Sequence, residues 1–73
     1  MLLLTTQEAM QVLDVSRDYL RWLRENNLLK MWKVGNTYRT TFEDIDDFIE
    51  LTRGHDLSGK GDIITFARLR KLI

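Results

Sequence analysis

Arg17, Arg21 and Arg24 are the residues whose type and spacing indicate the chemistry of this chain. Positions i, i+4 and i+7 lie on the same side of a helix, so the three guanidinium groups form one narrow row, here called the arginine stripe. Like charges at this spacing destabilise a helix by about a few tenths of a kcal/mol per pair unless an anion compensates them. The stripe therefore favours a nucleic-acid partner, and a solvated basic face is the alternative.

A predicted β-hairpin follows the stripe and carries further cations. Residues 30–34 and 37–40 are rich in β-branched, aromatic and long side chains, which are typical of strands. Gly35 and Asn36 between them are typical of a tight two-residue turn. The basic residues of this hairpin are Lys30, Lys33 and Arg39. A basic helix followed by a basic hairpin predicts a surface for a nucleic-acid groove.

The formal net charge of the 73 residues is zero, but the charges are distributed in blocks. Residues 17–39 hold six bases and two acids, whereas residues 40–56 hold six acids and one base. A molecule with one basic and one acidic side is oriented by the field of a polyanion even when its net charge is small. The zero net charge is therefore compatible with DNA binding.

The composition argues against catalysis and against metal binding. The chain has no cysteine and one histidine, His55, so it lacks a thiol nucleophile and a zinc cluster of His and Cys ligands. We expect no enzyme activity, no cofactor and no metal. No apolar run approaches the roughly 20 residues of a membrane span, which predicts a cytoplasmic protein without membrane contact.

Capping patterns predict two short helices before the hairpin. Residues 2–4 suit a short edge strand, and Thr5 then precedes Glu8 at the spacing of a capping box, so a helix should run to about Asp14. Ser16 is a strong N-cap candidate for a second helix over residues 17–26. Two helices joined this closely form a helix-turn-helix.

A third helix and a tail follow the hairpin. Thr41 and Asp44 repeat the capping spacing, and apolar residues from Phe42 onward predict a helix to about Leu51. Residues 52–62 are predicted to form a flexible linker, and residues 63–73 an amphipathic helix. The fold class is therefore mainly α with a small β-hairpin: a winged helix-turn-helix at residues 1–51 in the order strand, helix, helix, wing hairpin, helix, plus a C-terminal amphipathic helix.

The first two-thirds of the chain resembles the excisionase-type and MerR-like DNA-binding domains. The resemblance rests on four stretches in the order of that family, at residues 3–9 (LLTTQEA), 15–17 (VSR), 33–39 (KVGNTYR) and 43–45 (EDI). The resemblance covers residues 2 to about 51. It differs from the family where Asp14 and Asn27 replace glycines that are common at the two turns.

The resemblance implies that the second helix enters the major groove of double-stranded DNA and that the wing reaches the adjacent minor groove or the backbone. It brings Arg17 and Tyr19 near base edges or phosphates and Arg21 onto the backbone, while Ser16 caps the helix and touches phosphate. Arg24 completes the recognition-helix set. The implied wing contacts are Lys33, Asn36, Thr37 and Arg39.

The other candidate side chains each have their own interpretation, and for several of them an alternative is open. Tyr19 and Trp22 flank the apolar face of the second helix, where aromatics by default cover the edge of the core, and contact with the DNA backbone is the alternative. Lys30 is a further candidate for backbone contact. Trp32 is expected to pack against the third helix. Asp18 caps the helix start, pairs with Arg21 or Trp22, or accepts from a cytosine amino group.

The tail has three expected fates: docking on its own domain, contact with another copy or a partner protein, or disorder until DNA is bound. Its partner-contact candidates, at the spacing of one helix face, are Phe66, Leu69 and Ile73. In the resembling excisionases such a tail contacts the integrase or recombinase, and neighbouring copies associate on DNA.

The leading functional hypothesis is a small phage or mobile-element protein that binds specific duplex DNA sequences and acts as an excisionase, a recombination directionality factor that bends DNA. A transcriptional repressor or an antitoxin-type autoregulator uses the same binding mode and is the first alternative. The alternative from another class is a protein-protein adaptor whose arginines are solvated. Salt-dependent duplex binding separates the adaptor from the other two.

Overall fold

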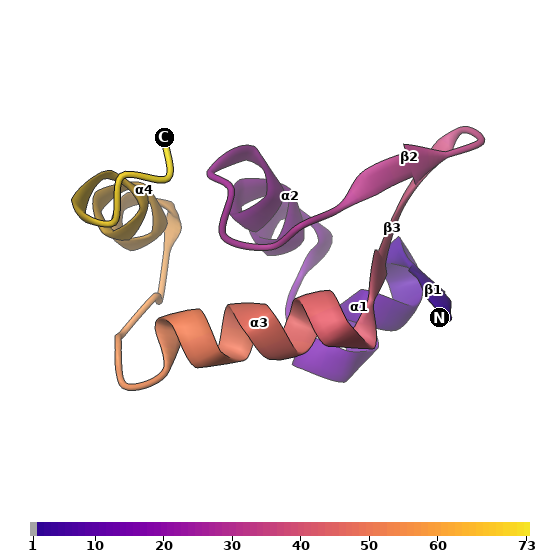
Figure 1. Ribbon diagram of the computed structural model, residues 1–73, viewed down its shortest axis with the longest axis horizontal. Coiled ribbons are helices and arrows are strands. Elements are labelled where there is room, and N and C mark those ends of the chain that lie inside the picture. The colour runs from indigo at the N-terminus through magenta and orange to yellow at the C-terminus, as the bar shows by residue number, and fades with distance from the viewer. Residues whose placement is uncertain (1) are drawn as a thin grey trace.

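The computed structural model describes residues 2–73, so Met1, where the expected winged domain begins, lies outside the described residues. Three strands and four helices form in this part of the chain (Figure 1). In chain order they are β1 (Leu3–Thr5), α1 (Thr6–Leu13), α2 (Arg17–Glu25), β2 (Trp32–Val34), β3 (Thr37–Thr41), α3 (Phe42–Thr52) and α4 (Lys60–Leu69).

Hydroxyl side chains begin the first three helices, as the spacing predicts. Thr5 and Glu8 form the complete capping box, because the Glu8 backbone N–H donates to Thr5 Oγ1 (3.0 Å) and the Thr5 N–H donates to Glu8 Oε1 (2.9 Å). Ser16 Oγ accepts from the N–H of Tyr19 (3.1 Å), and Thr41 Oγ1 accepts from the N–H of Asp44 (3.1 Å). These bonds satisfy N–H groups that a helix leaves unpaired at its start.

The two turns around α2 use left-handed residues other than glycine. Asp14 (φ 55°) ends α1 and Asn27 (φ 61°) follows α2, and both residue types tolerate this conformation. After the second turn the N–H groups of Leu28 and Leu29 both bond to the Leu23 carbonyl (2.9 and 3.3 Å). These bonds return the chain to the core beside the helix it has just left.

The three strands form one antiparallel sheet in the order β1-β3-β2. Strand β3 lies in the centre, with Leu4 opposite Thr40 on one side and Lys33 opposite Tyr38 on the other. Gly35 takes a positive φ (73°) in the turn between β2 and β3, as the Gly35-Asn36 pair predicts. The hairpin projects beyond the helices at one end of the molecule (Figure 1).

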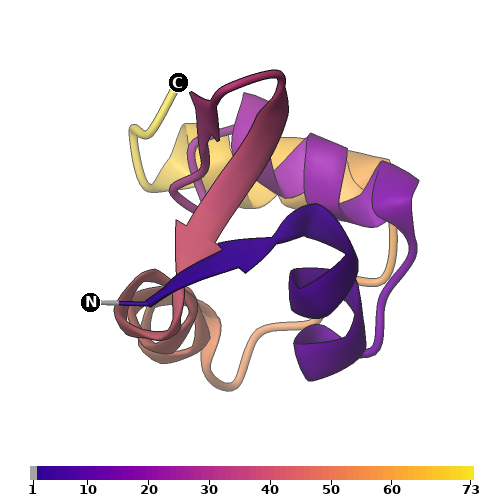
Figure 2. The same cartoon turned by 90° about the vertical axis from the view of Figure 1, so that its right-hand side faces the viewer.

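The two faces of the sheet differ. Leu4 and Thr40 are buried on the face that meets the core, and strand alternation places Trp32 and Arg39 on the opposite face. That face lies at the front of Figure 2, with α2 and α4 behind the sheet. Trp32 is 36% exposed and does not belong to the core cluster, so its expected packing against the third helix stays a prediction. Its position across from Arg39 keeps its ring on the outer face.

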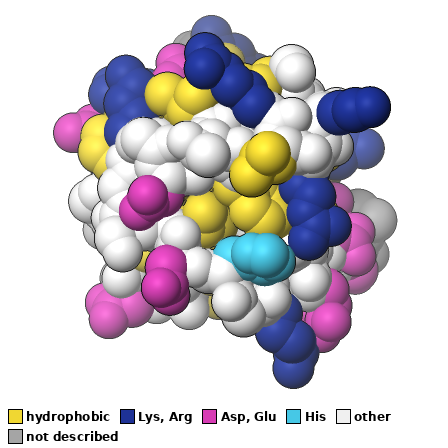
Figure 3. Space-filling model, turned by 90° about the vertical axis from the view of Figure 1, so that its left-hand side faces the viewer, with side chains coloured by type: hydrophobic (Ala, Val, Ile, Leu, Met, Phe, Trp, Pro, Cys, Tyr) yellow, Lys and Arg dark blue, Asp and Glu magenta, His cyan; other side chains and the backbone are white. Residues whose placement is uncertain are grey.

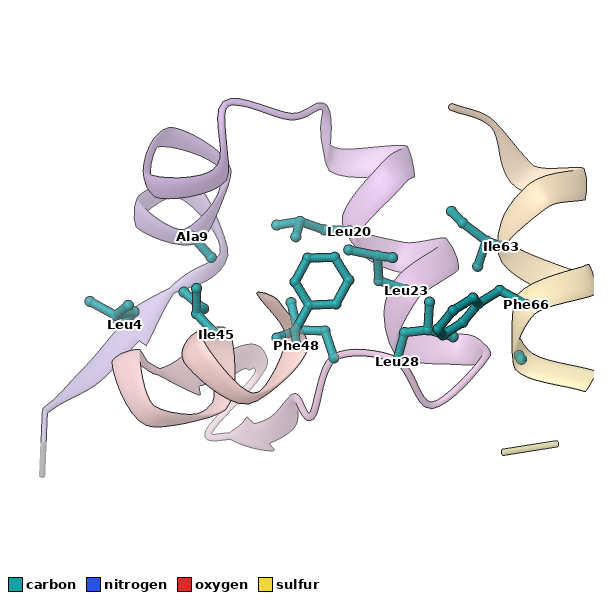
Figure 4. Packing of buried hydrophobic residues seen from close by; sticks show 11 residues of the cluster. Leu4, Ala9, Leu20, Leu23, Leu28, Ile45, Phe48, Ile63 and Phe66 are labelled. Carbon is teal, nitrogen blue, oxygen red and sulfur yellow. The ribbon is translucent and has the colours of Figure 1, made fainter. Parts of the chain in front are cut away.

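The core joins α4 to the rest of the molecule. Leu20 and Leu23 of α2 pack with Phe48 of α3, and Ile63 and Phe66 of α4 join the same buried cluster (Figure 4). Polar contacts reinforce this packing, because Asn27 Nδ2 donates to the carbonyl of Leu72 (2.8 Å). In the described chain the tail therefore docks on its own domain, which is the first of its three expected fates.

The C-terminal helix differs from the expected one. It begins at Lys60 after Gly59 and ends at Leu69, whereas residues 63–73 were expected to be helical. Lys71 takes a positive φ (58°), and the N–H of Leu72 bonds to the carbonyl of Ala67 (2.8 Å), which is a common way to end a helix. Ile73 is therefore not on the helix. Within residues 2–73, no helix has the length and apolar character that crossing a membrane requires.

Candidate nucleic-acid interface

The arginine stripe lines a groove between α2 and the sheet. Leu20 and Leu23 anchor the other side of α2 in the core, and this burial turns the stripe towards β3. The groove has a volume of about 190 Å³. Its lining includes all three members of the stripe, namely Arg17, Arg21 and Arg24, together with Thr6, Leu20, Met31 and Tyr38.

A second hollow, of about 400 Å³, lies beside the first and is lined mainly by the wing. The two hollows share Thr6, Arg17 and Tyr38, so they form one continuous concave surface. The wing residues that line it are all four of those expected, namely Lys33, Asn36, Thr37 and Arg39. The structure thus brings the stripe and the wing cations to one surface, which we call the basic groove.

Tyr38 is an aromatic member of the basic groove, and the sequence interpretation did not single it out as a site residue. The guanidinium carbon of Arg24 lies 3.8 Å from the centre of the Tyr38 ring, and Lys33 Nζ lies 5.6 Å from the same centre. Both distances are within the range of cation–π attraction. The available signal was strand alternation, which puts Tyr38 on the same face as Lys33 and the buried Thr40.

The wing cations lie on opposite faces of the sheet. Lys33 shares the inner face with Tyr38, whereas Arg39 lies on the outer face between Thr5 and Trp32 on the neighbouring strands. Arg39 is half-buried, and its Nε atom is buried without a hydrogen-bond partner. Although the two side chains leave opposite faces of the sheet, both line the second hollow at the hairpin.

The pKa of the Glu8 carboxylate is lowered by its neighbours at the start of α1 and by Arg39 of the wing. The N–H and the hydroxyl of Thr5 hydrogen-bond to it and lower the pKa of Glu8, and the positive charge of Arg39 lowers it further by a smaller amount. The carboxylate is therefore already held by the capping box at the start of α1. It offsets part of the Arg39 charge at the edge of the basic groove.

Asp18, the one acid within the first turn of α2, pairs with Arg21. Asp18 Oδ1 lies 3.4 Å from Arg21 Nη2, and both side chains are exposed. A carboxylate in the first turn also suits the helix dipole. Exposed pairs of this kind contribute at most about 1 kcal/mol, so an approaching phosphate can compete for Arg21 at little cost.

Tyr19 and Trp22 face α4 and the core rather than the basic groove. The hydroxyl of Tyr19 donates to the carbonyl of Leu57 in the segment before α4. Partial burial raises the pKa of Tyr19, and the negative charge of Asp62 raises it further. Trp22 is half-buried against the core, with its ring centre 6.2 Å from that of Tyr19. The default interpretation as core cover therefore describes both rings, and the family-based position of Tyr19 near DNA does not match its contacts.

Two other groups of expected contact residues lie outside the basic groove. Lys30 lines an adjoining hollow with the acidic residues Asp44 and Asp47 of α3, and this hollow shares Arg24 and Met31 with the basic groove. Of the partner-contact candidates, Phe66 is buried (7% exposed) because the tail docks on its own domain, so it is not available to a partner in this structure. Leu69 (77%) and Ile73 (54%) are exposed.

Figure 3 views the molecule from the α4 end, where hydrophobic side chains lie next to His55. The His55 ring meets the edge of the Phe66 ring at 5.1 Å between centres, and Arg70 approaches His55 Nε2 at 3.4 Å. Among residues 2–73, no cluster of three or more His, Cys, Asp or Glu side chains is arranged to hold a metal ion.

A strand, two helices, a hairpin and a third helix, with a basic groove between the second helix and the hairpin, define a winged helix-turn-helix protein, as the sequence predicts. A family model described as "Helix-turn-helix domain" matches residues 3–52, which is more than half of the chain. The chain therefore belongs to the helix-turn-helix domain family, and this membership supports DNA binding. Comparisons with curated proteins and with solved structures found no match.

Proposed function

We propose that the protein binds specific sequences of double-stranded DNA, with α2 in the major groove and the wing on the adjacent minor groove or backbone. The observation that carries this proposal is the continuity of the basic groove, in which Arg17 is shared between the part beside α2 and the part beside the wing. A helix about 10–12 Å wide fits the B-DNA major groove, and a projecting hairpin then reaches the flanking backbone.

Within this mode the side chains have different roles. Arg17 lies in the first turn of α2, where a recognition helix presents side chains to base edges, and a bidentate contact to guanine discriminates by about 1–3 kcal/mol. Arg21 and Lys33 neutralise phosphates, which adds salt-dependent affinity without sequence preference. The acidic α3 stays away from the backbone.

The experiment that tests the proposal measures duplex binding against salt concentration. A bound duplex is first selected from a random pool, and the affinity of wild type, Arg17→Ala and Arg53→Ala is then followed by fluorescence anisotropy. Arg53 is the matched control, because it is an exposed arginine at the end of α3 that pairs with Glu50 (2.6 Å). Arg17→Ala should weaken the selected site about tenfold and relax its preference at one base pair, and Arg53→Ala should change affinity by less than about twofold.

The finer role we propose is that of an excisionase that bends attachment-site DNA, which rests on the resemblance of residues 2–51 to that family. A repressor or antitoxin-type autoregulator would bind in the same way. A recombination assay with a cognate integrase separates them, because an excisionase should be required for excision and a repressor should leave excision unchanged. If the wild type shows no duplex binding at low salt, both roles fail and the adaptor hypothesis takes their place.

A further inference from the structure

The Tyr38 side chain and backbone together contact three other elements, α2, β2 and α1. On one side the Arg24 guanidinium of α2 lies against the ring (3.8 Å to the ring centre). Lys33 of β2 is the cross-strand partner of Tyr38, and its Nζ lies 5.6 Å from the ring centre. The backbone carbonyl of Tyr38 accepts a hydrogen bond from Thr6 Oγ1 at the start of α1 (3.0 Å).

The contact of Arg24 with the ring has a consequence for the whole stripe. The neighbouring guanidinium groups repel one another, so a free Arg24 would turn into solvent and sample many rotamers. The negative face of an aromatic ring attracts the cation and restricts it to one position. In that position Arg24 still lines the groove beside Arg17 and Arg21, because all three belong to the same hollow.

The same contact links α2 to the wing. Arg24 lies in the last turn of α2, and Tyr38 lies in the central strand β3, so the stack joins the recognition helix directly to the hairpin. A ligand that spans both elements gains affinity when their relative orientation is already set before it binds.

We propose that Tyr38 is a positioning residue, whose ring holds Arg24 in the basic groove and fixes the wing relative to α2 before DNA arrives. The proposal rests on the proposed function for its effect on affinity, whereas the stack itself exists in the free protein. Tyr38 acts through Arg24 and Lys33, and its own contact with DNA is not required.

The first test compares replacements of the ring. Tyr38→Phe keeps the aromatic face and should bind the selected duplex like the wild type. Tyr38→Leu keeps apolar bulk without the ring and should weaken binding about two- to fivefold. Equal binding by the wild type and a folded Tyr38→Leu variant would overturn the proposal.

The second test asks whether the effect passes through Arg24. Arg24→Lys keeps the charge but loses the planar guanidinium that stacks on the ring. Arg21→Lys is the matched control, because Arg21 lines the same groove and pairs with Asp18 instead of Tyr38. The cost of Arg24→Lys should shrink when Tyr38 is already leucine, whereas the cost of Arg21→Lys should be the same in both backgrounds. Additive costs in both pairs would contradict a positioning role.

A measurement on the free protein separates this inference from DNA binding. The guanidinium carbon of Arg24 lies 3.8 Å from the ring centre, so the NMR resonances of the nearby δ protons should move upfield, return towards ordinary values in Tyr38→Leu and stay shifted in Tyr38→Phe. If Tyr38→Leu does not fold, the shift is compared between Arg24 and Arg21 in the wild type. Unshifted Arg24 resonances refute the stack, whereas shifted resonances without any duplex binding refute the proposed function alone.

Discussion

Helices α2 and α3 are built alike but carry opposite charge. Each is capped by a hydroxyl side chain and anchors itself through two fully or nearly buried residues, Leu20 and Leu23 in α2 and Ile45 and Phe48 in α3. The exposed side of α2 carries the arginine stripe. The polar side of α3 carries only acids within the helix, namely Glu43, Asp44, Asp46, Asp47 and Glu50.

This difference shows that one face of a helix packs in the core, whereas its other face sets the charge that the helix presents. The core requires apolar side chains at a helical period, and it leaves the charge of the remaining positions free. A polyanion repels the acidic α3 and attracts the basic α2, so both helices help to orient the molecule in its field. A net charge of zero therefore accompanies a strongly polarised surface.

The largest expected effect tests the similarity of the two helices. Leu23→Ala in α2 and Ile45→Ala in α3 should each lower the free energy of unfolding by about 2–5 kcal/mol, because both side chains are almost fully buried. Urea denaturation followed by circular dichroism measures the change. Ile49→Ala is the control, since Ile49 is an exposed residue of α3 and its loss should cost less than about 1 kcal/mol. Unequal costs for the two buried positions would show that one helix matters less to the fold.

The next effect tests the opposite charges. Arg21→Glu in α2 and Asp46→Lys in α3 each change the net charge by two, in opposite directions. Arg21→Glu should weaken duplex binding about tenfold or more at low salt, because a phosphate contact becomes a repulsion. Asp46→Lys should change binding by less than about threefold, since α3 lies outside the basic groove. A large gain from Asp46→Lys would mean that α3 also approaches the DNA.

The caps of the two helices should differ in strength. Ser16→Ala should cost about 1 kcal/mol of unfolding free energy through the lost bond to the Tyr19 N–H. Thr41→Ala should cost more, because Thr41 is buried and its hydroxyl also donates to Asp44 Oδ2 (2.8 Å). Thermal unfolding of the two variants side by side measures the order, and the reverse order would contradict this account of the caps.

The smallest expected effect concerns single acids on the two helices. Asp18→Asn removes a carboxylate beside the basic groove and releases Arg21, so duplex binding should tighten about two- to threefold at low salt. Asp46→Asn should leave binding unchanged. The gain should disappear at high salt, where exposed charges are screened. Weaker binding by Asp18→Asn would point instead to a direct contact between Asp18 and a DNA base.

Much of the local structure was predictable because its causes are local. The capping pairs at Thr5, Ser16 and Thr41 and the turn at Gly35 depend on side chains within a few residues of the backbone groups that they satisfy. The arginine stripe follows from helical spacing alone. The basic character of α2 and of the hairpin was therefore predictable before the groove between them was known.

The positions that the sequence left open or assigned wrongly depend on contacts between segments that lie far apart in the chain. Tyr19 was expected near DNA from the family resemblance, but its hydroxyl bonds to Leu57, and that carbonyl lies 38 positions away in the chain. Phe66 is buried because α4 folds back on α2, which is one of the three fates that its amphipathic pattern left open.

The sequence by itself determined the helices, the hairpin and the two blocks of opposite charge, because hydrogen bonding at caps and turns and the periods of helix and strand act over a few residues. Only the tertiary structure decided that the stripe and the wing share one groove, that Arg24 stacks on Tyr38, and that Tyr19 bonds to the segment before α4. Those contacts join residues that the chain brings together only when the core has closed, and the pattern of any single segment does not specify its partner.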